Sequence, residues 1–195
     1  MAKYTKIPST TFQKIQLNAG MLLTSFDPET ATVDEKSMLA ATSGGVNFTA
    51  TPNFTDFGED IDNCPKNTKE LKHLESWEAT MSGSAVTMDT ALAKSFIGLA
   101  DVSGTEVTPR NDVQDSDFAD IWWVGDYSAV NEDGASGKAG FIAIQMMNAL
   151  SSGGFQLQST DKAKGTFEFE YTAHYSMTAQ TVVPFNVYIS AGTED

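Results

Sequence analysis

The sequence predicts a mainly β protein with one helix lying against a sheet. Threonine, valine, isoleucine and phenylalanine are frequent, and glycine, serine, asparagine and aspartate separate the runs in which they occur. Several runs alternate apolar and polar residues, as half-buried strands do. Only one stretch has convincing helical periodicity, so strands dominate the predicted fold.

The helix is predicted from about residue 89 to 98. Asp89 precedes it, and its carboxylate can accept the free amide protons of a first turn. Leu92, Phe96 and Leu99 recur at i, i+4 and i+7 and form one apolar stripe. Gly98 suits the C-terminal cap.

The first strand with clear alternation is predicted at residues 77–81, where apolar residues face one way and Glu78 and Thr80 the other. Ser82-Gly83 has the composition of a turn, so residues 85–88 are expected to form the returning strand.

The later part of the chain predicts the remaining strands. Residues 121–124 (IWWV) are apolar on both faces and should be central or lie at an interface. A polar loop is expected over residues 125–137. Further strands are expected at residues 141–147, 155–158, 166–175 and 184–189. In the longest one Phe167, Phe169 and Tyr171 should face one way, and Glu168, Glu170 and Thr172 the other.

The segment from about residue 43 to 65 has a different character. It is predicted to be an extended loop or arm carrying Phe48, Phe54 and Phe57 among polar and acidic residues. Two roles are open for these rings: they cover the protein's own core, or the arm docks on a neighbouring subunit. No segment has the composition of a linker, so a single domain over residues 1–195 is expected.

The charge is strongly negative, with 26 acidic and 12 basic residues and a formal net charge of −14. Such a surface repels phosphates and membrane headgroups, which disfavours tight nucleic-acid binding. Many proteins are acidic for solubility alone, and that alternative stays open. The lone Cys64 forms no intrachain disulfide. The apolar stretch at residues 141–150 is too short to span a bilayer, so a soluble protein made in a cytoplasm, with no membrane partner, is expected.

No catalytic, metal-binding or cofactor-binding residues are predicted. His73 and His174 lie far apart in the sequence, and neither has a metal-ligand spacing with Cys64. Phosphate loops, dinucleotide fingerprints and nucleophile elbows do not occur in the sequence. The strongest constellation is the acidic set Asp112, Asp115, Asp117 and Asp120, which resembles the start of a calcium loop but has Asp120 where the loop requires glycine. A solvated acidic turn is the expected alternative.

Several blocks resemble the major tail tube proteins of long-tailed, siphophage-type bacteriophages and prophages of Gram-positive bacteria. They are spread from residue 63 onward, over about two thirds of the chain. The blocks are residues 63–71 (NCPKNTKEL), 74–78 (LESWE), 81–83 (MSG), 90–95 (TALAKS), 109–112 (PRND), 118–128 (FADIWWVGDYS), 140–144 (GFIAI), 147–150 (MNAL), 153–156 (GGFQ), 162–165 (KAKG) and 171–176 (YTAHYS).

The resemblance implies a β-sandwich or half-barrel with a flanking helix and extended loop arms. It implies a structural virion protein, not an enzyme, whose hexameric rings stack into a tail tube and whose inner strands close one β-barrel around the DNA. Implied partners are further copies of the chain, the tail tip or baseplate, the tape measure and tail terminator proteins, and DNA in non-specific passage. The implied location is the virion tail, after assembly in the host cytoplasm.

Two hypotheses follow for particular residues. The face with Glu168 and Glu170 is a candidate for the lumen wall, with the outer surface as the competing assignment. The arm over residues 43–60 is expected to make contacts between rings, and its deletion to leave a folded monomer that does not polymerise.

Two alternatives of another class remain. A β-rich binding module, such as an adhesin or carbohydrate-binding domain, could use Trp122 and Trp123 to stack on sugars. The flanking Ile121 and Val124 instead favour burial of this pair. A hydrolase of unfamiliar type would lose activity on substitution of His174 or Asp120.

Overall fold

The computed structural model describes residues 11, 15–16, 18–127 and 140–190. Most of this chain forms antiparallel strands, and the element order is β1 (Met21–Leu23), β2 (Met38–Ala40), β3 (Thr42–Asp56), β4 (Lys72–Ala85), α1 (Thr90–Ile97), β5 (Ala100–Ser103), β6 (Glu106–Pro109), β7 (Ala119–Tyr127), β8 (Gly140–Ser151), β9 (Gln156–Gln158), β10 (Thr166–Thr172) and β11 (Phe185–Ser190). Single 3-10 turns occur at Glu35–Ser37, Lys69–Leu71 and Asp115–Asp117.

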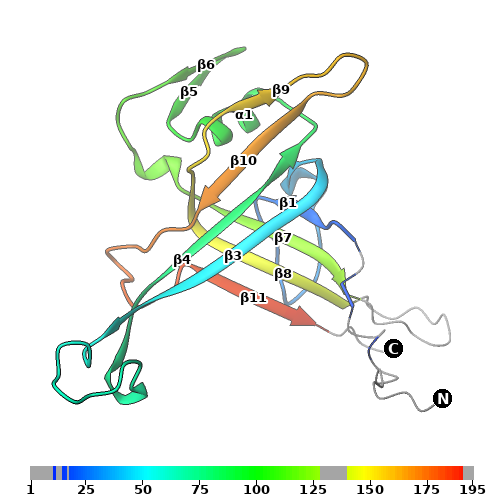
Figure 1. The fold of residues 1–195 in the computed structure, drawn as a ribbon. Helices are drawn as coiled ribbons and strands as arrows, with labels where there is room; N and C mark the ends of the chain where they lie inside the picture. The colour runs from blue at the N-terminus through cyan, green and yellow to red at the C-terminus, as the bar shows by residue number, and fades with distance from the viewer. Residues whose placement is uncertain (1–10, 12–14, 17, 128–139, 191–195) are drawn as a thin grey trace.

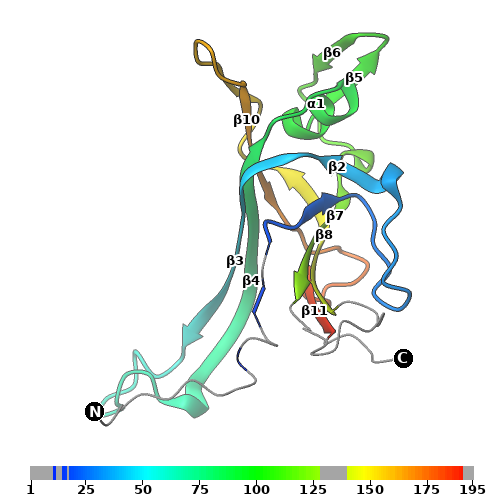
Figure 2. The ribbon, with the colours of Figure 1, turned by 90° about the vertical axis from the view of Figure 1, so that its right-hand side faces the viewer.

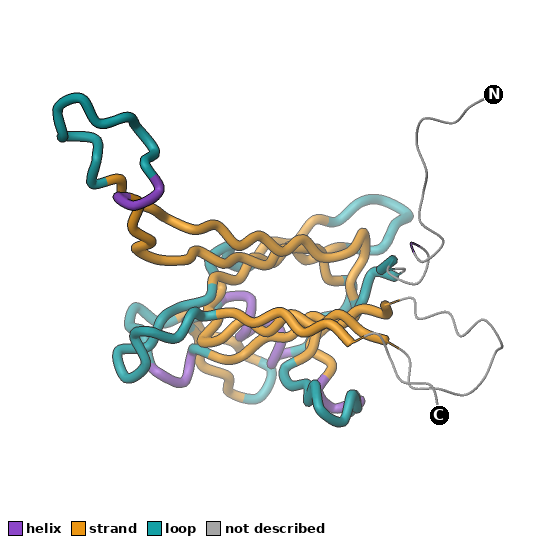
Figure 3. The backbone as a smooth tube through the Cα atoms, turned by 90° about the horizontal axis from the view of Figure 1, so that it is seen from below, coloured by secondary structure: helices purple, strands orange, loops and turns teal. Residues whose placement is uncertain are grey.

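Among the described residues, nine strands form two layers that are joined along one side, and β5 and β6 form a separate hairpin (Figures 1 and 3). One layer holds β2, β1, β7, β8 and β11, and the other holds β9, β10, β4 and β3. The connection is the end of β8, where Leu150 and Ser151 pair with Thr172 and Tyr171 of β10. The predicted mainly β fold, a sandwich or half-barrel with a flanking helix, is confirmed.

The bend that lets β8 join both layers is centred on Asn148, which has a left-handed backbone with φ of 48°. Its N–H donates to Asp120 Oδ1 at 3.2 Å, and its side-chain amide donates to the His174 carbonyl oxygen at 3.1 Å. Asparagine tolerates this conformation better than most residues because its short polar side chain bonds locally. These contacts hold the corner of the sandwich.

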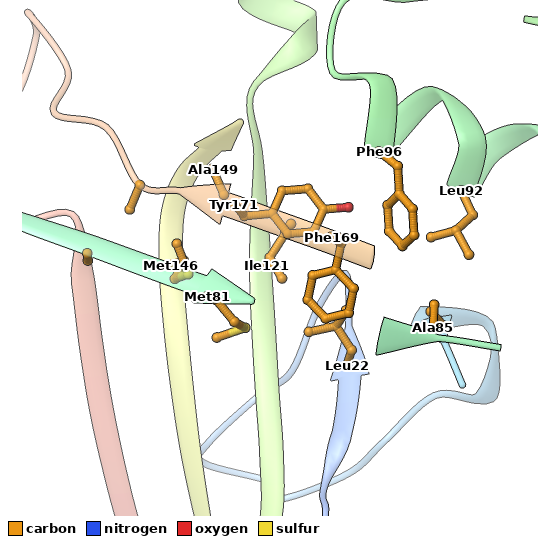
Figure 4. Close-up of a cluster of buried hydrophobic side chains, with 13 residues drawn as sticks. Leu22, Met81, Ala85, Leu92, Phe96, Ile121, Met146, Ala149, Phe169 and Tyr171 are labelled. Carbon is orange, nitrogen blue, oxygen red and sulfur yellow. The ribbon is translucent and has the colours of Figure 1, made fainter. Parts of the chain in front are cut away.

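The main core lies between the layers and is closed at one end by α1 (Figure 4). Leu92 and Phe96 are buried on the helix, and the Phe96 ring lies 5.5 Å from Phe169 and 6.2 Å from Tyr171. The Tyr171 hydroxyl and Ser95 Oγ are 2.6 Å apart. Burial raises the pKa of Tyr171 far above its usual range, so the phenol stays protonated and hydrogen-bonded.

The helix agrees with its prediction at both ends. Asp89 Oδ1 accepts the Leu92 N–H at 2.7 Å, and Gly98 ends the helix with φ of 84°. A Cβ at Gly98 would lie 3.3 Å from Ser151, so the position favours glycine for its conformation and for its space.

The expected turn at Ser82-Gly83 is wrong, and so is the expected returning strand at residues 85–88. β4 runs straight through, and Ser82 and Gly83 pair with Glu170 and Phe169 on one side and with Asn47 and Val46 on the other. A Cβ at Gly83 would lie only 2.9 Å from the Phe169 ring. This glycine makes room for a ring from the neighbouring strand, which is a requirement that sequence proximity does not reveal.

The predicted loop over residues 43–65 is instead mostly strand. β3 pairs with β4 from Thr42 to Asp56, and only the tip beyond Asp56 is irregular. Gly44 and Gly45, with φ of 83° and 85°, form a bulge between Ser43 and Val46, and Pro52 occupies an edge strand. Both features give the segment a loop-like composition.

The other expected strands are present as β7, β8, β9, β10 and β11, with bounds that differ by a few residues. The short strands β1 and β2 and the β5–β6 hairpin were not predicted. The expected polar loop at residues 125–137 begins later than predicted, since β7 continues to Tyr127, and the rest of it lies outside the described residues.

We expect Phe96→Ala to lower the free energy of unfolding by about 3–5 kcal/mol, because it empties the space between α1 and the two rings of β10. Urea denaturation measures the change. Phe57→Ala removes the same ring from an exposed position, at 62% exposure, and should cost less than about 0.5 kcal/mol. Equal losses in the two variants would contradict this account of the core.

Candidate functional site

One face of the β9–β10–β4–β3 layer is polar along its length and points away from the core. Period-two alternation places Phe169, Tyr171, Ala79 and Met81 on the inner face, where they are buried. Up to the bulge between Asn53 and Phe54, the outward residues of these strands are hydroxyl, amide or carboxylate side chains: Asn47, Thr49, Thr51, Asn53, Ser76, Glu78, Thr80, Ser82, Ser84, Gln156, Gln158, Thr166, Glu168, Glu170 and Thr172. We call this set the polar face.

Glu168 and Glu170 occupy the middle of the polar face, as their predicted alternation requires. Ser84 Oγ lies 2.7 and 2.8 Å from the two Glu168 carboxylate oxygens, and Ser152 Oγ donates to Glu170 at 3.1 Å. Neutral hydroxyl groups therefore orient these carboxylates and leave their negative charge uncompensated. None of the residues of the polar face is a lysine or arginine. The face presents anionic charge on a surface of small polar groups.

The second candidate feature is the long β3–β4 hairpin, whose far end projects beyond the other layer (Figure 2). Its three predicted aromatic residues divide between the two roles considered above. Phe48 packs against the main core, and its ring lies 5.7 Å from Phe185. Phe54 and Phe57 lie farther out and are 50% and 62% exposed. Phe48 is thus a core residue, whereas Phe54 and Phe57 are available for contact.

The end of the hairpin, residues 56–72, is called the tip below. Asp56 organises it: Oδ1 accepts the Gly58 N–H at 2.9 Å and Oδ2 accepts the Asn67 N–H at 2.8 Å. These bonds, the Gly58 bond first, hold the pKa of Asp56 below its usual range. One carboxylate thereby ties the outgoing and returning halves of the tip together. An aspartate at the start of a turn-rich segment is the sequence feature that could have indicated this role.

Arg110 holds two members of the acidic set at residues 112–120. Arg110 Nε lies 3.1 Å from Asp101 Oδ1, and its Nη1 lies 3.3 Å from Asp112 Oδ1. Its Nη2 pairs with Asp117, whose side chain is fully buried. Among the described residues, no group of three or more His, Cys, Asp or Glu side chains is placed to hold a metal ion. The cluster ties the β5–β6 hairpin to the turn that precedes β7.

The residues considered for hydrolysis have structural partners. Asp120 accepts from the Asn148 N–H and from the Gln145 side chain, the latter at 2.9 Å. His174 Nδ1 lies 3.1 Å from the Asn148 carbonyl oxygen. Both side chains therefore hold the bend in β8. Cys64 lies in the tip, where Sγ is 3.7 Å from Thr68 Oγ1.

The tryptophan pair does not form an exposed platform. Trp122 is buried and stacks on Tyr188 with ring centroids 5.6 Å apart. Trp123 is half-buried, and its indole N–H donates to the Ala19 carbonyl oxygen at 3.0 Å. This arrangement disfavours the sugar-stacking role that an adhesin or carbohydrate-binding module would give the pair.

Comparisons with known proteins give only distant likenesses. No family model matches the chain, and no curated protein matches it. One similar solved structure is the tail of an empty gene transfer agent particle with C6 symmetry. The likeness has a TM-score of 0.43 and 7% identity over 88% of this chain and 96% of that one. Another is the virion of a native gene transfer agent particle, with a TM-score of 0.43 and 8% identity over 88% and 95% of the two chains.

Likenesses this loose transfer no function, so the inferences below depend on the chain's own residues.

Within the described part of the chain, no helix is long and apolar enough to cross a membrane.

We expect Asp56→Asn to loosen the tip, because an amide binds two backbone N–H groups more weakly than a carboxylate does. Hydrogen exchange of the Gly58 and Asn67 amides should become faster, while exchange in β10 stays unchanged. Because the folded pKa is lowered, the contribution is present at neutral pH and is lost as the pH falls through that pKa. Asp60→Asn, an exposed substitution in the same tip, is the control and should leave both amides protected.

Proposed function

We propose that this chain is a structural protein of a phage-type tail, and that it polymerises as stacked hexameric rings into a tube that conducts DNA. The polar face carries the proposal: a sheet packed on one side and uniformly polar, anionic and cation-free on the other suits the wall of a DNA channel. The sequence blocks that resemble those of major tail tube proteins support the same proposal. In this proposal residues 1–195 act as one tail-tube domain.

The sheet edges support assembly into a ring. Among the described residues, β3 pairs only with β4 and β9 only with β10, so each leaves one edge unpaired. Unpaired edges are sites where another chain can add a strand. Closing the edges of successive subunits into one barrel would give hydrogen-bond partners to the unpaired backbone N–H and C=O groups of these edges. It would also put the polar face around the lumen.

The charge of the polar face supports a role in conduction and not in binding. DNA carries a dense negative charge, and lysine or arginine contacts to its phosphates dominate affinity for it. A wall with Glu78, Glu168 and Glu170 and no cation repels the backbone, so DNA could slide along it without being held. The further partners in this proposal are the tail tip or baseplate, the tape measure and the tail terminator.

The hairpin tip is the proposed contact between rings, but the deletion expected from the sequence alone needs correction. Residues 43–60 include β3, and its Val46, Phe48 and Ala50 pack against the main core. Their removal would unfold the protein. Removing only residues 58–70 and joining the strands with Asn-Gly preserves the hairpin, because this pair suits a two-residue turn.

We expect the purified protein to form hollow tubes or six-fold rings at high concentration in negative-stain electron microscopy. The variant with residues 58–70 replaced by Asn-Gly should keep its melting temperature and form rings that do not stack. A wild type that stays monomeric at every concentration, also after addition of isolated tail tips, would contradict the proposed function. Long tubes from the variant would contradict the role of the tip alone.

We expect Glu168→Lys with Glu170→Lys to make the tube hold DNA, because the change replaces repulsion of phosphates by attraction. Tubes polymerised with short DNA duplexes should then retain nuclease-resistant DNA, and wild-type tubes should retain none. Glu29→Lys with Glu35→Lys makes the same charge change at exposed positions away from the polar face and is the control. A cryo-electron map with Glu168 and Glu170 outside the lumen would overturn the assignment.

A further inference from the structure

The tip carries charges of opposite sign on its two halves. Its outgoing half has Glu59, Asp60 and Asp62, all exposed, and its returning half has Lys66 and Lys69, followed by Lys72. Within the tip Lys66 lies 3.6 Å from Glu59 and Lys69 lies 3.3 Å from Glu70, but all four side chains are highly exposed. Such pairs contribute little and exchange readily for better ones.

The opposite end of the molecule is also divided by charge. There the β5–β6 hairpin carries Glu106, while its Asp101 already pairs with Arg110. The β9–β10 loop carries Lys162 and Lys164, and Asp161 lies 4.0 Å from Lys162 in an exposed pair (Figure 1). Of the lysines in the described ranges, all except Lys36 and Lys94 lie in the tip or in the β9–β10 loop. In a protein with a net charge of −14, five of the seven lysines in the described ranges therefore lie at the two ends of the long direction.

Both ends also expose apolar side chains next to the charges. The tip exposes Phe57 and Ile61, and the other end exposes Val102 and Leu157 at 42% and 57%. Apolar groups rimmed by charges are typical of surfaces that contact another protein. Since the two ends lie on opposite sides of the body, contact between them joins different surfaces of successive copies and can repeat without limit.

We propose that the tip of one copy docks between the β5–β6 hairpin and the β9–β10 loop of a second copy. The lysines of the tip then face Glu106, and its acidic half faces Lys162 and Lys164. This inference rests on the proposed function, in which rings stack, and it names the surface that receives the tip. It also fixes a polarity, because only one relative orientation pairs both halves with opposite charge.

Charge reversal on each side tests the docking. Lys66→Glu with Lys69→Glu reverses the tip, and Thr105→Lys with Glu106→Lys reverses the exposed β5–β6 turn. Each variant alone should raise the concentration needed for tube growth, measured by light scattering and electron microscopy, by about tenfold or more, because like charges then meet. The four substitutions together should restore growth to within a few-fold of the wild type.

The two variants control for net charge, since the first makes the protein more acidic and the second less acidic. If both variants impair tube growth and their combination restores it, the cause is charge pairing between the tip and the β5–β6 turn. Unchanged melting temperatures establish that all variants fold. Wild-type growth by both variants, or no rescue by the combination, would overturn the docking and leave the tube intact as a proposal. A wild type that forms neither rings nor tubes would overturn the proposed function itself.

Discussion

The ladder between β3, β4 and β10 is the interaction on which the rest of the structure depends. β4 pairs with β3 over its whole length and with β10 over the half nearer the helix. Its inner residues Ala79, Met81 and Ala85 form one wall of the main core, and its outer residues lie on the polar face. A shift of β4 by one residue would exchange the two faces. Core, polar face and tip are therefore set by one register.

Where a structural feature depends on neighbours in sequence, it could be predicted from the residues alone. The helix is of this kind, because Asp89 and Gly98 act on the adjacent turns. The alternation of Phe169 and Tyr171 with Glu168 and Glu170 is another, because pleating requires it whatever the partner strand is. This pattern predicted that Glu168 and Glu170 lie on one face, away from the core. It did not predict that β4 and β9 are the neighbouring strands.

The errors arise where a residue serves a partner far along the chain. Gly83 has the local appearance of a turn residue, but it accommodates the Phe169 ring. Pro52 and Gly44-Gly45 lower the strand propensity of β3, whose pairing with β4 supplies the stability that its composition lacks. β1 and β2 have three residues each, too few for periodicity, and pair through contacts that no local pattern records. Asp120 and His174 are likewise candidates for catalysis by residue type, but in the fold their side chains hold the bend in β8.

The length of the β3–β4 hairpin has a mechanical consequence. Hydrogen bonds in an antiparallel ladder lie perpendicular to the strands. A pull on the tip, directed away from the body, therefore loads the bonds between β4 and β10 in shear, and all of them must yield together. Peeling, in which bonds break one after another, would need a force across the strands. In a filament joined through such hairpins, axial tension would therefore separate the exchangeable contacts between copies before it unfolded a subunit.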